Sequence, residues 1–564
     1  PLSFCGYRVR HAEAIEHGRR AQPLLGLRAG ATGLAVSLRH FWQNFPKAFE
    51  IQDRSLSVRF FPPQSADVHE LQGGEQKTHV LYLAFLGPAD SARDADWTRM
   101  PLTAHSSPNW YSGAEAAPYL TPKRTDPHPQ YVQLVDAAIE GNDSFAAKRE
   151  RIDEYGWRHF GDLYADHEGA FYTGPQPVVS HYNNQYDAIH GAIVQFLRSA
   201  DTRWFHLADE LASHVVDIDI YHTDADKAAY SHGLFWHTDH YTDARTATHR
   251  SFSRRARAIG GGPCAEHCYT TGLLYHYLLT GNTASREAVL ELAGWIIRSD
   301  DGRQTVLRWL DRGETGSASA TQDRSYHGPG RGPAHAISAL LDAFLLTQDS
   351  QFLRKADQLL RRCIHPVDDI ARRELLDPER RWSYTVFLQV LGKYLDRARE
   401  RNQREGMFAY ARASLLHYAR WMAEHEVPYL SRPERLVYPT ETWSAQDMRK
   451  SDVFKFAAKY GPPALRQRFL ERSHFFFQSS VGELAAAKTR SFTRPLVLLM
   501  SYGYMQAFFT QHPEESVPDP ADPEDFGSPQ AFLPQRASAL RKLALLCGLV
   551  LATAGLGVLS WLTR

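Results

Sequence analysis

The first part of the chain has the residue pattern of β-strands. Apolar and polar residues alternate in SLSVRFF at 55–61, and an apolar run, HVLYLAFLG, follows at 79–87. Alternation with period two places one face of a strand against a core, and the Gly, Pro and Asp residues between these segments favour turns. We therefore expect a β-sandwich over residues 1–125, truncated at its start.

From about residue 130 the pattern changes to long helical segments. Three stretches share one theme, an apolar helix, a short polar turn and a second helix: AIVQFLRSADTRWFHLADELASHVV, GLLYHYLLTGNTASREAVLELAGWII and AISALLDAFLLTQDSQFLRKADQLLRRCI. Two later hairpins fit the theme less well. Single hairpins of this kind cannot bury their apolar faces, so they must stack, either as an open solenoid or as a closed ring of inner and outer helices.

Polar and aromatic residues gather just before the first helix of successive hairpins. These segments are SHYNNQYD, HTDHYTDARTATHR with AEHCYTT, RSYHGPGRGPAH, and YPTETWSAQD. A closed ring would bring these helix N-termini together at one end of a central funnel, where side chains and backbone N–H groups converge on a ligand. The pattern therefore favours the ring, and we predict an (α/α) toroid over residues 126–510.

The C-terminal end is apolar enough to cross a membrane. Residues 543–562 are uncharged and mostly apolar, and as a helix they would span the hydrocarbon core of a bilayer, about 30 Å. We predict a transmembrane anchor over 541–564. Before it, at 511–540, we expect a Pro- and acid-rich disordered spacer that holds the globular part off the membrane. Basic residues flank the apolar run on both sides, so the charge pattern sets no orientation.

Composition narrows the classes of function. The 564 residues are too many for one hydrophobic core, so we expect several domains. Lys plus Arg and Asp plus Glu balance at 64 each, without a long basic run, and we therefore expect no nucleic-acid partner. Aromatic residues make up 12% of the chain. Flat amphipathic rings can stack on sugar faces while their polar atoms bind hydroxyl groups, which favours a carbohydrate ligand.

Several short motifs resemble one enzyme superfamily. FWQNFP, GGEQKTH, YGWRHFGD, SHYNNQYD, LFWHTDHY and HCYTTGLLYHYLLTGN together resemble the exo-acting rhamnogalacturonan lyase superfamily. Its members have an N-terminal barrel, a central β-sandwich and a C-terminal (α/α) toroid, and the likeness covers residues 30 to about 510. The resemblance implies a polysaccharide or oligosaccharide substrate, while the reaction stays open because related toroids carry both lyases and hydrolases.

The favoured reaction is β-eliminative cleavage of an acidic, uronic-acid-containing polysaccharide. A base must remove the proton α to the carboxylate, a cation or amide must neutralise the carboxylate, and a second group must protonate the leaving oxygen. We predict as catalytic Tyr186, His240, His181, His267, Arg250 and Glu441. We predict as substrate-binding Tyr182, Asn183, Asn184, Trp236, His237, Tyr241, His249, Tyr326 and His327. His240 or Tyr186 is the expected base. Arg250 and Asn184 are expected to hold the carboxylate, and Trp236 or Tyr241 to stack on a sugar ring.

Two alternatives stay open. An inverting glycoside hydrolase on the same scaffold needs two carboxyl groups roughly 6.5–9.5 Å apart. Carboxyl groups at the helix entrances are Glu441, Asp187, Glu266 and Asp447. Glu441 is the strongest of these candidates, since its Pro, Trp and Tyr neighbours would raise its pKa. A membrane-tethered protein that binds polysaccharide without cleaving it would use the same aromatic and amide side chains.

We expect no resident cofactor, with Ca²⁺ as the one candidate cation. HTDH places His237 and His240 three residues apart, and DIDIYHTDAD supplies four aspartates, but no segment matches HExxH or a calcium loop. A polysaccharide substrate favours an extracytoplasmic position for the globular part, anchored by the C-terminal helix. That position implies a signal peptide upstream of Pro1.

Overall fold

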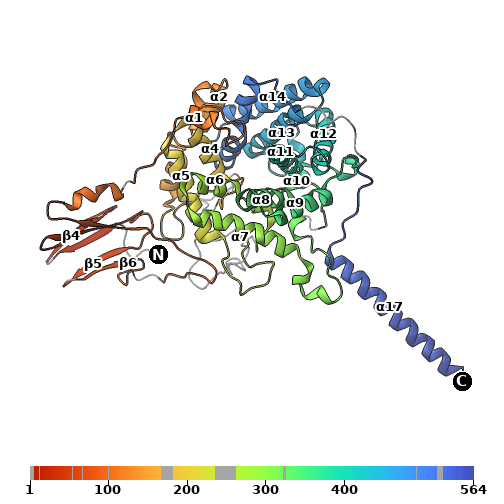
Figure 1. Cartoon of the computed structure of the whole chain (residues 1–564), viewed down its shortest axis with the longest axis horizontal. Helices are drawn as coiled ribbons and strands as arrows, with labels where there is room; N and C mark the ends of the chain where they lie inside the picture. Colours follow the sequence, from red (N-terminus) through yellow and green to blue (C-terminus); the bar gives the residue numbers. More distant parts are fainter. Residues whose placement is uncertain are drawn as a thin grey trace.

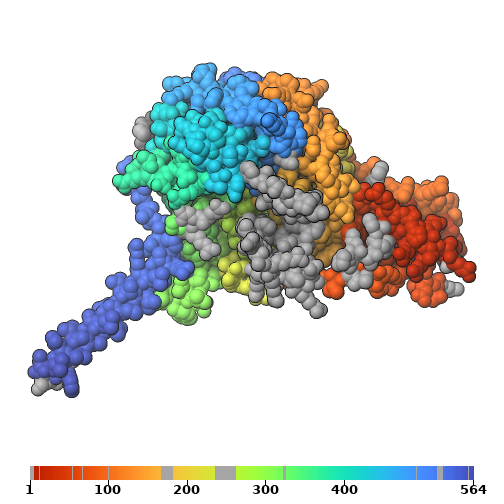
Figure 2. All heavy atoms as spheres, turned by 180° about the vertical axis from the view of Figure 1, so that it is seen from behind, coloured from red at the N-terminus to blue at the C-terminus, as the bar shows by residue number. Residues whose placement is uncertain are grey.

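The computed structural model describes residues 6–11, 13–53, 55–65, 68–99, 101–166, 182–235, 262–321, 325–490, 492–517 and 525–563. These residues form small sheets near the N-terminus, a large helical part, and one long helix at the C-terminus (Figure 1). The sheets and the C-terminal helix lie on opposite sides of the helical part, as both overall views show (Figure 2).

The strands found among the described residues form three separate antiparallel sheets. The first pairs β1 (Tyr7–His11) with β2 (Ala14–Gly18), the second orders β3 (Leu24–Ala29), β4 (Thr32–Leu38) and β7 (Leu81–Leu86), and the third pairs β5 (Ala48–Gln52) with β6 (Ser55–Arg59). The two strands predicted at 55–61 and 79–87 are thus confirmed as β6 and β7. A small buried cluster of Ala35, Leu86 and Ala95 lies between the second sheet and the short helix Ala92–Arg99, and the β-sandwich stays a prediction.

The large helical part is built from helix pairs. The first helices of the pairs are α4 (Ala188–Ser199), α6 (Thr271–Thr280), α8 (Arg331–Thr347), α11 (Tyr384–Glu400) and α13 (Glu441–Tyr460). Their partners are α5 (Thr202–His214), α7 (Thr283–Asp300), α9 (Ser350–Cys363), α12 (Met407–His425) and α14 (Pro463–Ala486). Each first helix packs on its own partner. The three stretches with the common sequence theme are the pairs α4–α5, α6–α7 and α8–α9.

The polar turns inside these three pairs share one conformation. Each first helix ends on a residue in the left-handed region, and the next residue is an Asp or Asn that caps the second helix. The terminating residues are Ala200, Gly281 and Gln348, and the capping residues are Asp201, Asn282 and Asp349. A left-handed C-cap stops a helix, and an Asx side chain satisfies a free N–H of the following one, so four residues reverse the chain.

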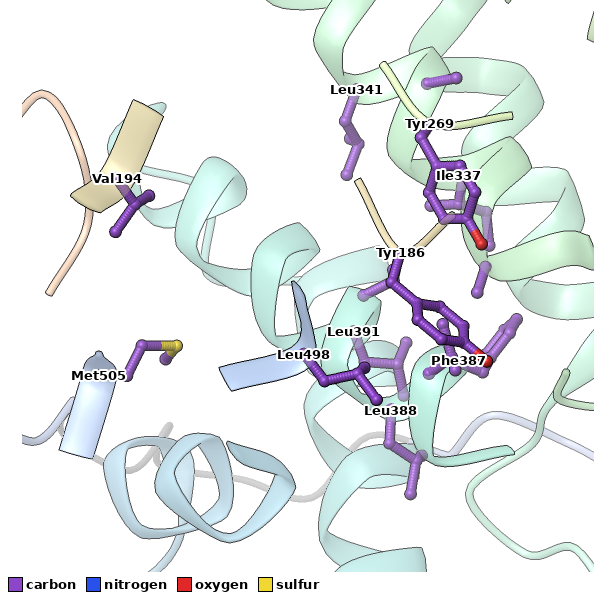
Figure 3. Close-up of a cluster of buried hydrophobic side chains, with 14 of the residues drawn as sticks. Tyr186, Val194, Tyr269, Ile337, Leu341, Phe387, Leu388, Leu391, Leu498 and Met505 are labelled. Atoms are coloured by element: carbon purple, nitrogen blue, oxygen red, sulfur yellow. The ribbon is translucent and has the colours of Figure 1, made fainter. Parts of the chain in front are cut away.

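The first helices of the pairs also pack on one another. They are neighbours in the order α4, α6, α8, α11 and α13, and α13 packs on α15 (Thr493–Leu498). The π-helical turn Leu499–Gly503 continues α15 toward α16 (Met505–Gln511) and packs on α4, which closes the order. Side chains of α8, α11 and α15 therefore meet in one buried cluster (Figure 3).

The helical part begins earlier than residue 126. The helix α1 (Pro108–Gly113) packs on α4, and α2 (Pro129–Asp136) packs on α14. Between them, Tyr119 donates a hydrogen bond of 2.7 Å to Asp396 of α11. Two short helices, α3 (Phe145–Ile152) and α10 (Pro378–Arg381), complete the helices of this part that the structure describes.

Polar contacts join the strand-rich segment to the helical part. Arg39 donates to Asp209 of α5 over 2.6 Å. The backbone N–H and the hydroxyl of Thr78 each lie 2.8 Å from an oxygen of Asp217. Arg158 binds Glu75, with 2.8 Å between Nη1 and Oε2. These contacts come from loops as well as strands, and they hold the sheets against one flank of the helical part.

The C-terminal segment returns to the helical part before it leaves it. The rings of Phe526 and Phe532 pack edge-on against Tyr410 and His327, with centroids 5.4 and 4.9 Å apart. We predicted disorder for residues 525–534, but this segment is docked on the helical part, because its two phenylalanines pack on aromatic partners. The helix α17 (Gln535–Leu562) follows, and its residues 535–556 are long and apolar enough to cross a membrane.

Candidate functional site

A cavity of about 1760 Å³ lies at the N-terminal ends of the first helices. Its lining includes residues at or before the starts of all five first helices and of α15. Residues that line it include Gln185 and Tyr186 before α4, Glu266 and His267 before α6, Arg331 at the start of α8, Trp382 before α11, Trp443 and Gln446 in α13, and Arg494 in α15. This placement agrees with the predicted convergence of polar helix entrances.

The segment before α4 has an unusual backbone. Asn183, Asn184, Tyr186 and Asp187 all have positive φ angles, between 50° and 60°. Asn and Asp tolerate this left-handed region because their short side chains bond locally, whereas Tyr does so at a cost of about 1 kcal/mol or more. The surrounding contacts must therefore hold Tyr186 in place. Strain of this kind concentrates at functional sites.

Hydrogen bonds hold this strained segment. The Asn183 amide donates to Asp219 over 2.8 Å, and the Asn184 side-chain oxygen accepts from the Ile189 N–H over 3.1 Å. Together with Tyr182, these two asparagines are buried and do not line the cavity. We predicted all three as substrate-binding residues, and this placement instead gives them a structural role beneath Tyr186.

Tyr186 itself reaches the cavity in a polar and cationic setting. Its hydroxyl accepts a hydrogen bond of 3.0 Å from Gln446. The guanidinium carbons of Arg449 and Arg494 lie 4.9 and 5.9 Å from the centroid of its ring. The ring stands edge-on to Trp382 at 6.4 Å, and it packs beside side chains of α8 and α11 (Figure 3).

Two arginines that line the cavity differ in their partners. Arg331 forms an ion pair of 2.8 Å with Glu266, so its charge is largely compensated. Arg494 donates from Nε and Nη2 to the Gln185 side-chain oxygen over 3.2 and 3.1 Å, which fixes its guanidinium with a neutral partner. These bonds use two of the five N–H groups of Arg494. Arg494 is therefore the better placed of the two to bind an anionic group.

Aromatic side chains line much of the remaining wall. They are Tyr230, Trp295, Trp382, Tyr438 and Trp443, besides Tyr186. The indole N–H of Trp443 donates to the Tyr438 carbonyl over 3.0 Å, which orients that ring at the start of α13. Flat rings beside polar groups suit a sugar, since its faces are apolar and its edges carry hydroxyls.

Among the other predicted residues, His267 and His327 line the cavity and Tyr326 does not. The His327 ring receives the edge of Phe532, and its Nδ1 lies 2.9 Å from the Ser319 hydroxyl. Tyr326 instead lies under Arg381, with 3.9 Å between the guanidinium carbon and the ring centroid. The docked C-terminal segment thus reaches one wall of the cavity.

The carboxyl groups predicted for a hydrolase lie mostly outside the cavity. Asp187 caps α4 and accepts the N–H groups of His190 and Gly272 over 3.2 and 3.0 Å; burial nevertheless raises its pKa to about 6. Burial also raises the pKa of Asp447 to about 7, although Lys450 lies 2.9 Å away. Glu441 is the first residue of α13. Of the four candidates, Glu266 is the one that lines the cavity.

Seven predicted site residues lie outside the residues that the structure describes. They are His181, Trp236, His237, His240, Tyr241, His249 and Arg250. Their predicted roles, including His240 as the base, stay predictions.

The described part of the chain holds no group of three or more His, Cys, Asp or Glu residues arranged to bind a metal ion. The aspartates considered for Ca²⁺ have protein partners instead: Asp217 accepts from Thr78, Asp219 from Asn183, and Asp224 lies 2.7 Å from His232. The Ca²⁺ site stays a prediction.

Sequence reasoning missed several residues that line the cavity. Arg331 and Trp443 lie inside segments that the sequence marks as polar helix entrances, but neither was selected. Trp382 and Arg494 lie at the entrances of α11 and α15, which belong to the less regular part of the pattern. Applying the same rule to the starts of α11 and α15 would have found both.

A scan against protein-family models and a search of curated protein sequences give no match for this chain.

Proposed function

We propose that this protein is a membrane-anchored, carbohydrate-active protein that takes an acidic polysaccharide into the cavity, and that its helical part is an (α/α) toroid. The closed order of first helices, each with its own outer partner, supports the toroid. The collection of helix N-termini around one cavity supports a ligand site at that end. The apolar helix α17 supports the anchor.

The observation that carries the proposal is the lining of the cavity. It combines aromatic faces with a guanidinium, Arg494, that is held rigidly by a neutral amide. An aromatic wall alone would suit many ligands. Arg494 has no carboxylate partner among the residues that the structure describes, which adds selectivity for an anionic group, and a uronic acid offers both a sugar face and a carboxylate.

The favoured reaction is β-elimination. Arg494 binds the carboxylate and makes the α-proton more acidic by neutralising charge. Tyr186 acts as the base in its deprotonated form: its phenolate oxygen takes this proton from C5, the C4–O bond breaks, a C4–C5 double bond forms, and the leaving oxygen takes up a proton from a general acid. His267, which lines the same cavity, is the described candidate for that second proton transfer.

The side chains of this cavity give less support to hydrolysis than to elimination. An inverting enzyme needs one protonated and one ionised carboxyl group with room for water between them. Among the described lining residues the carboxyl groups are Glu266 and Glu379. Glu266 forms an ion pair of 2.8 Å with Arg331, and Glu379 accepts the Val437 N–H over 2.7 Å. We therefore place β-elimination first and hydrolysis second.

The test is an activity assay on the full chain in lipid nanodiscs, with a panel of acidic and neutral polysaccharides. Absorbance of the new double bond and titration of reducing ends are followed together. We expect both signals to rise on an acidic polymer. Reducing ends without absorbance would overturn elimination in favour of hydrolysis, and binding without either signal would favour the non-enzymatic alternative.

Two matched variants locate the base. Tyr186→Phe removes the hydroxyl and should lower the rate about 100-fold or more, as the loss of a general base does. Tyr230→Phe removes a hydroxyl from another tyrosine that lines the same cavity and should leave the rate within about twofold. Equal activity of the two variants would contradict the assignment of Tyr186. Loss of activity in Glu266→Gln but not in Tyr186→Phe would support the hydrolase.

A further inference from the structure

The start of α17 is fixed to a loop of the helical part, residues 301–314. Gln535, the first residue of α17, is buried, and its side-chain amide donates to the carbonyls of Gly302 and Asp311, each over 2.7 Å. Its backbone N–H donates to the Glu314 carbonyl, and its side-chain oxygen accepts from Thr305, again over 2.7 Å each. The anchor helix is therefore clamped to the globular part at its first turn.

A second set of contacts continues the clamp toward the membrane span. Asp311 accepts hydrogen bonds of 2.6 Å from both Ser538 and Lys542. Lys542 is the last charged residue before the uncharged run 543–562. When that run spans the hydrocarbon core, Lys542 lies at the headgroups, because a cation does not enter the core. The loop that carries Asp311 must lie there as well.

The same loop presents apolar side chains to its surroundings. Val306 and Trp309, in the short helix Val306–Trp309, are 90% and 78% exposed. The loop also carries Arg303, Arg308 and Arg312, and α17, which packs on the short helix Val306–Trp309, carries Arg536, Arg541 and Lys542. The acids of the loop 301–314 are Asp301, Asp311 and Glu314, and all three have basic partners. An exposed Trp among cations suits the boundary between lipid headgroups and acyl chains.

We infer that the loop 301–314 is a second membrane contact, which inserts Trp309 and Val306 at the headgroup–acyl boundary beside α17. The occupant of this apolar surface is the lipid bilayer, because the surface is continuous with the membrane-spanning helix and joined to it by the clamp. Two contacts fix the orientation of the globular part, whereas a single helix on a flexible spacer would leave it free to tumble.

The orientation has a consequence for the cavity. Part of its wall is built by the residues that lead into the membrane span: Phe532, Leu533, Pro534, Arg536, Ala537 and Leu540. Ala537 precedes the uncharged run by six residues, about 9 Å of helix. The rim of the cavity thus lies at the headgroups, and its ligand is taken up at the membrane surface. The identity of that ligand rests on the proposed function, while the membrane contact does not.

The test uses tryptophan quenching by lipids brominated in their acyl chains, with the full chain in nanodiscs. The emission of a single tryptophan is the difference between the wild type and a variant that lacks it. Trp309→Phe reports the proposed contact. Trp110→Phe is the matched control, since Trp110 is 62% exposed on α1, far from α17 (Figure 1). Trp561→Phe, inside the uncharged run, is the positive control.

We expect brominated lipid to remove about half or more of the Trp309 emission and of the Trp561 emission, and to leave that of Trp110 unchanged. If the Trp309 emission is as insensitive as that of Trp110 while Trp561 is quenched, the loop does not touch the bilayer and the inference is wrong. A blue-shifted but unquenched Trp309 would assign the surface to another protein and would also overturn it. Neither result depends on a polysaccharide or on activity.

Discussion

The contact between the starts of α4 and α6 is the point at which a single methyl group should disturb both stability and the cavity. Gly272 is the second residue of α6, and its N–H donates to Asp187. A Cβ atom at this position would lie 2.5 Å from the His190 nitrogen and 2.7 Å from the Ile189 Cβ, and it would also overlap an oxygen of Asp187. Two of these neighbours belong to the rigid first turn of α4, so they cannot swing aside.

Gly272→Ala must therefore push the two helix N-termini apart. Overpacking in a rigid core costs about 1–3 kcal/mol, and weakening the Asp187 cap adds about 1 kcal/mol. Higher helix propensity returns about 0.5–1 kcal/mol to the alanine variant. The free energy of unfolding should fall by roughly 1–3 kcal/mol. Because Asp187 follows Tyr186 directly, the variant should also displace Tyr186 and weaken ligand binding in the cavity.

Gly482→Ala is the matched control. Gly482 lies within α14, and a Cβ atom there would meet no atom within 4 Å. Helix propensity alone then applies, and this variant should be more stable by about 0.5–1 kcal/mol. Thermal unfolding of the full chain in detergent, followed by helical circular dichroism, should show the midpoint falling for Gly272→Ala and rising for Gly482→Ala. A rise in both variants would refute the steric argument.

Three further predictions concern other parts of the molecule. Burial raises the pKa of Asp187 from 3.8 to about 6, so the folded protein binds this proton more tightly than the unfolded chain, and roughly 3 kcal/mol of stability is lost as the pH rises from about 4 to 6. In Asp187→Asn the unfolding midpoint should change less with pH across this range, and an unchanged slope would contradict the assignment. Arg158→Met removes the Arg158 cation from the buried Glu75 and should cost about 3–5 kcal/mol at the contact between the strands and the helical part. Limited proteolysis should then cleave the chain faster before residue 100, and cleavage at the wild-type rate would contradict this prediction. Trp443→Ala should weaken binding of an acidic oligosaccharide by about 1 kcal/mol, or about fivefold, in calorimetry; equal affinity would remove Trp443 from the site.

The regular parts of this fold could be predicted from the sequence because each depends on a pattern of neighbouring residues. The turns RSAD, LTGN and LTQD recur because each pairs a left-handed C-cap with an Asx N-cap, and both requirements concern neighbouring residues. The strands at 55–61 and 79–87 were readable from period-two alternation. The apolar run 543–562 needed only length and composition.

The sequence predicted where the candidate site lies, but not which of the nearby residues line it. The segment SHYNNQYD is rich in hydrogen-bonding side chains, and sequence reasoning assigned them to a ligand. In the structure Asn183, Asn184 and Asp187 serve a strained turn, and Tyr186 reaches the cavity. A polar side chain that binds backbone and one that binds a ligand are the same residue type, so composition cannot separate them.

Local patterns are enough to predict the helix pairs, their turns, the two strands and the long apolar run at the C-terminus, because periodicity, capping and hydropathy act over a few neighbouring residues. The contacts that place Arg494 beside Gln185 and Tyr186 in the cavity wall come from the tertiary structure, as does the docking of the C-terminal segment through Phe532 and Gln535. These contacts join residues hundreds of positions apart. They arise when the helices close on one another, and the packing of that closed order, rather than any local pattern, selects which polar side chains are left facing the cavity.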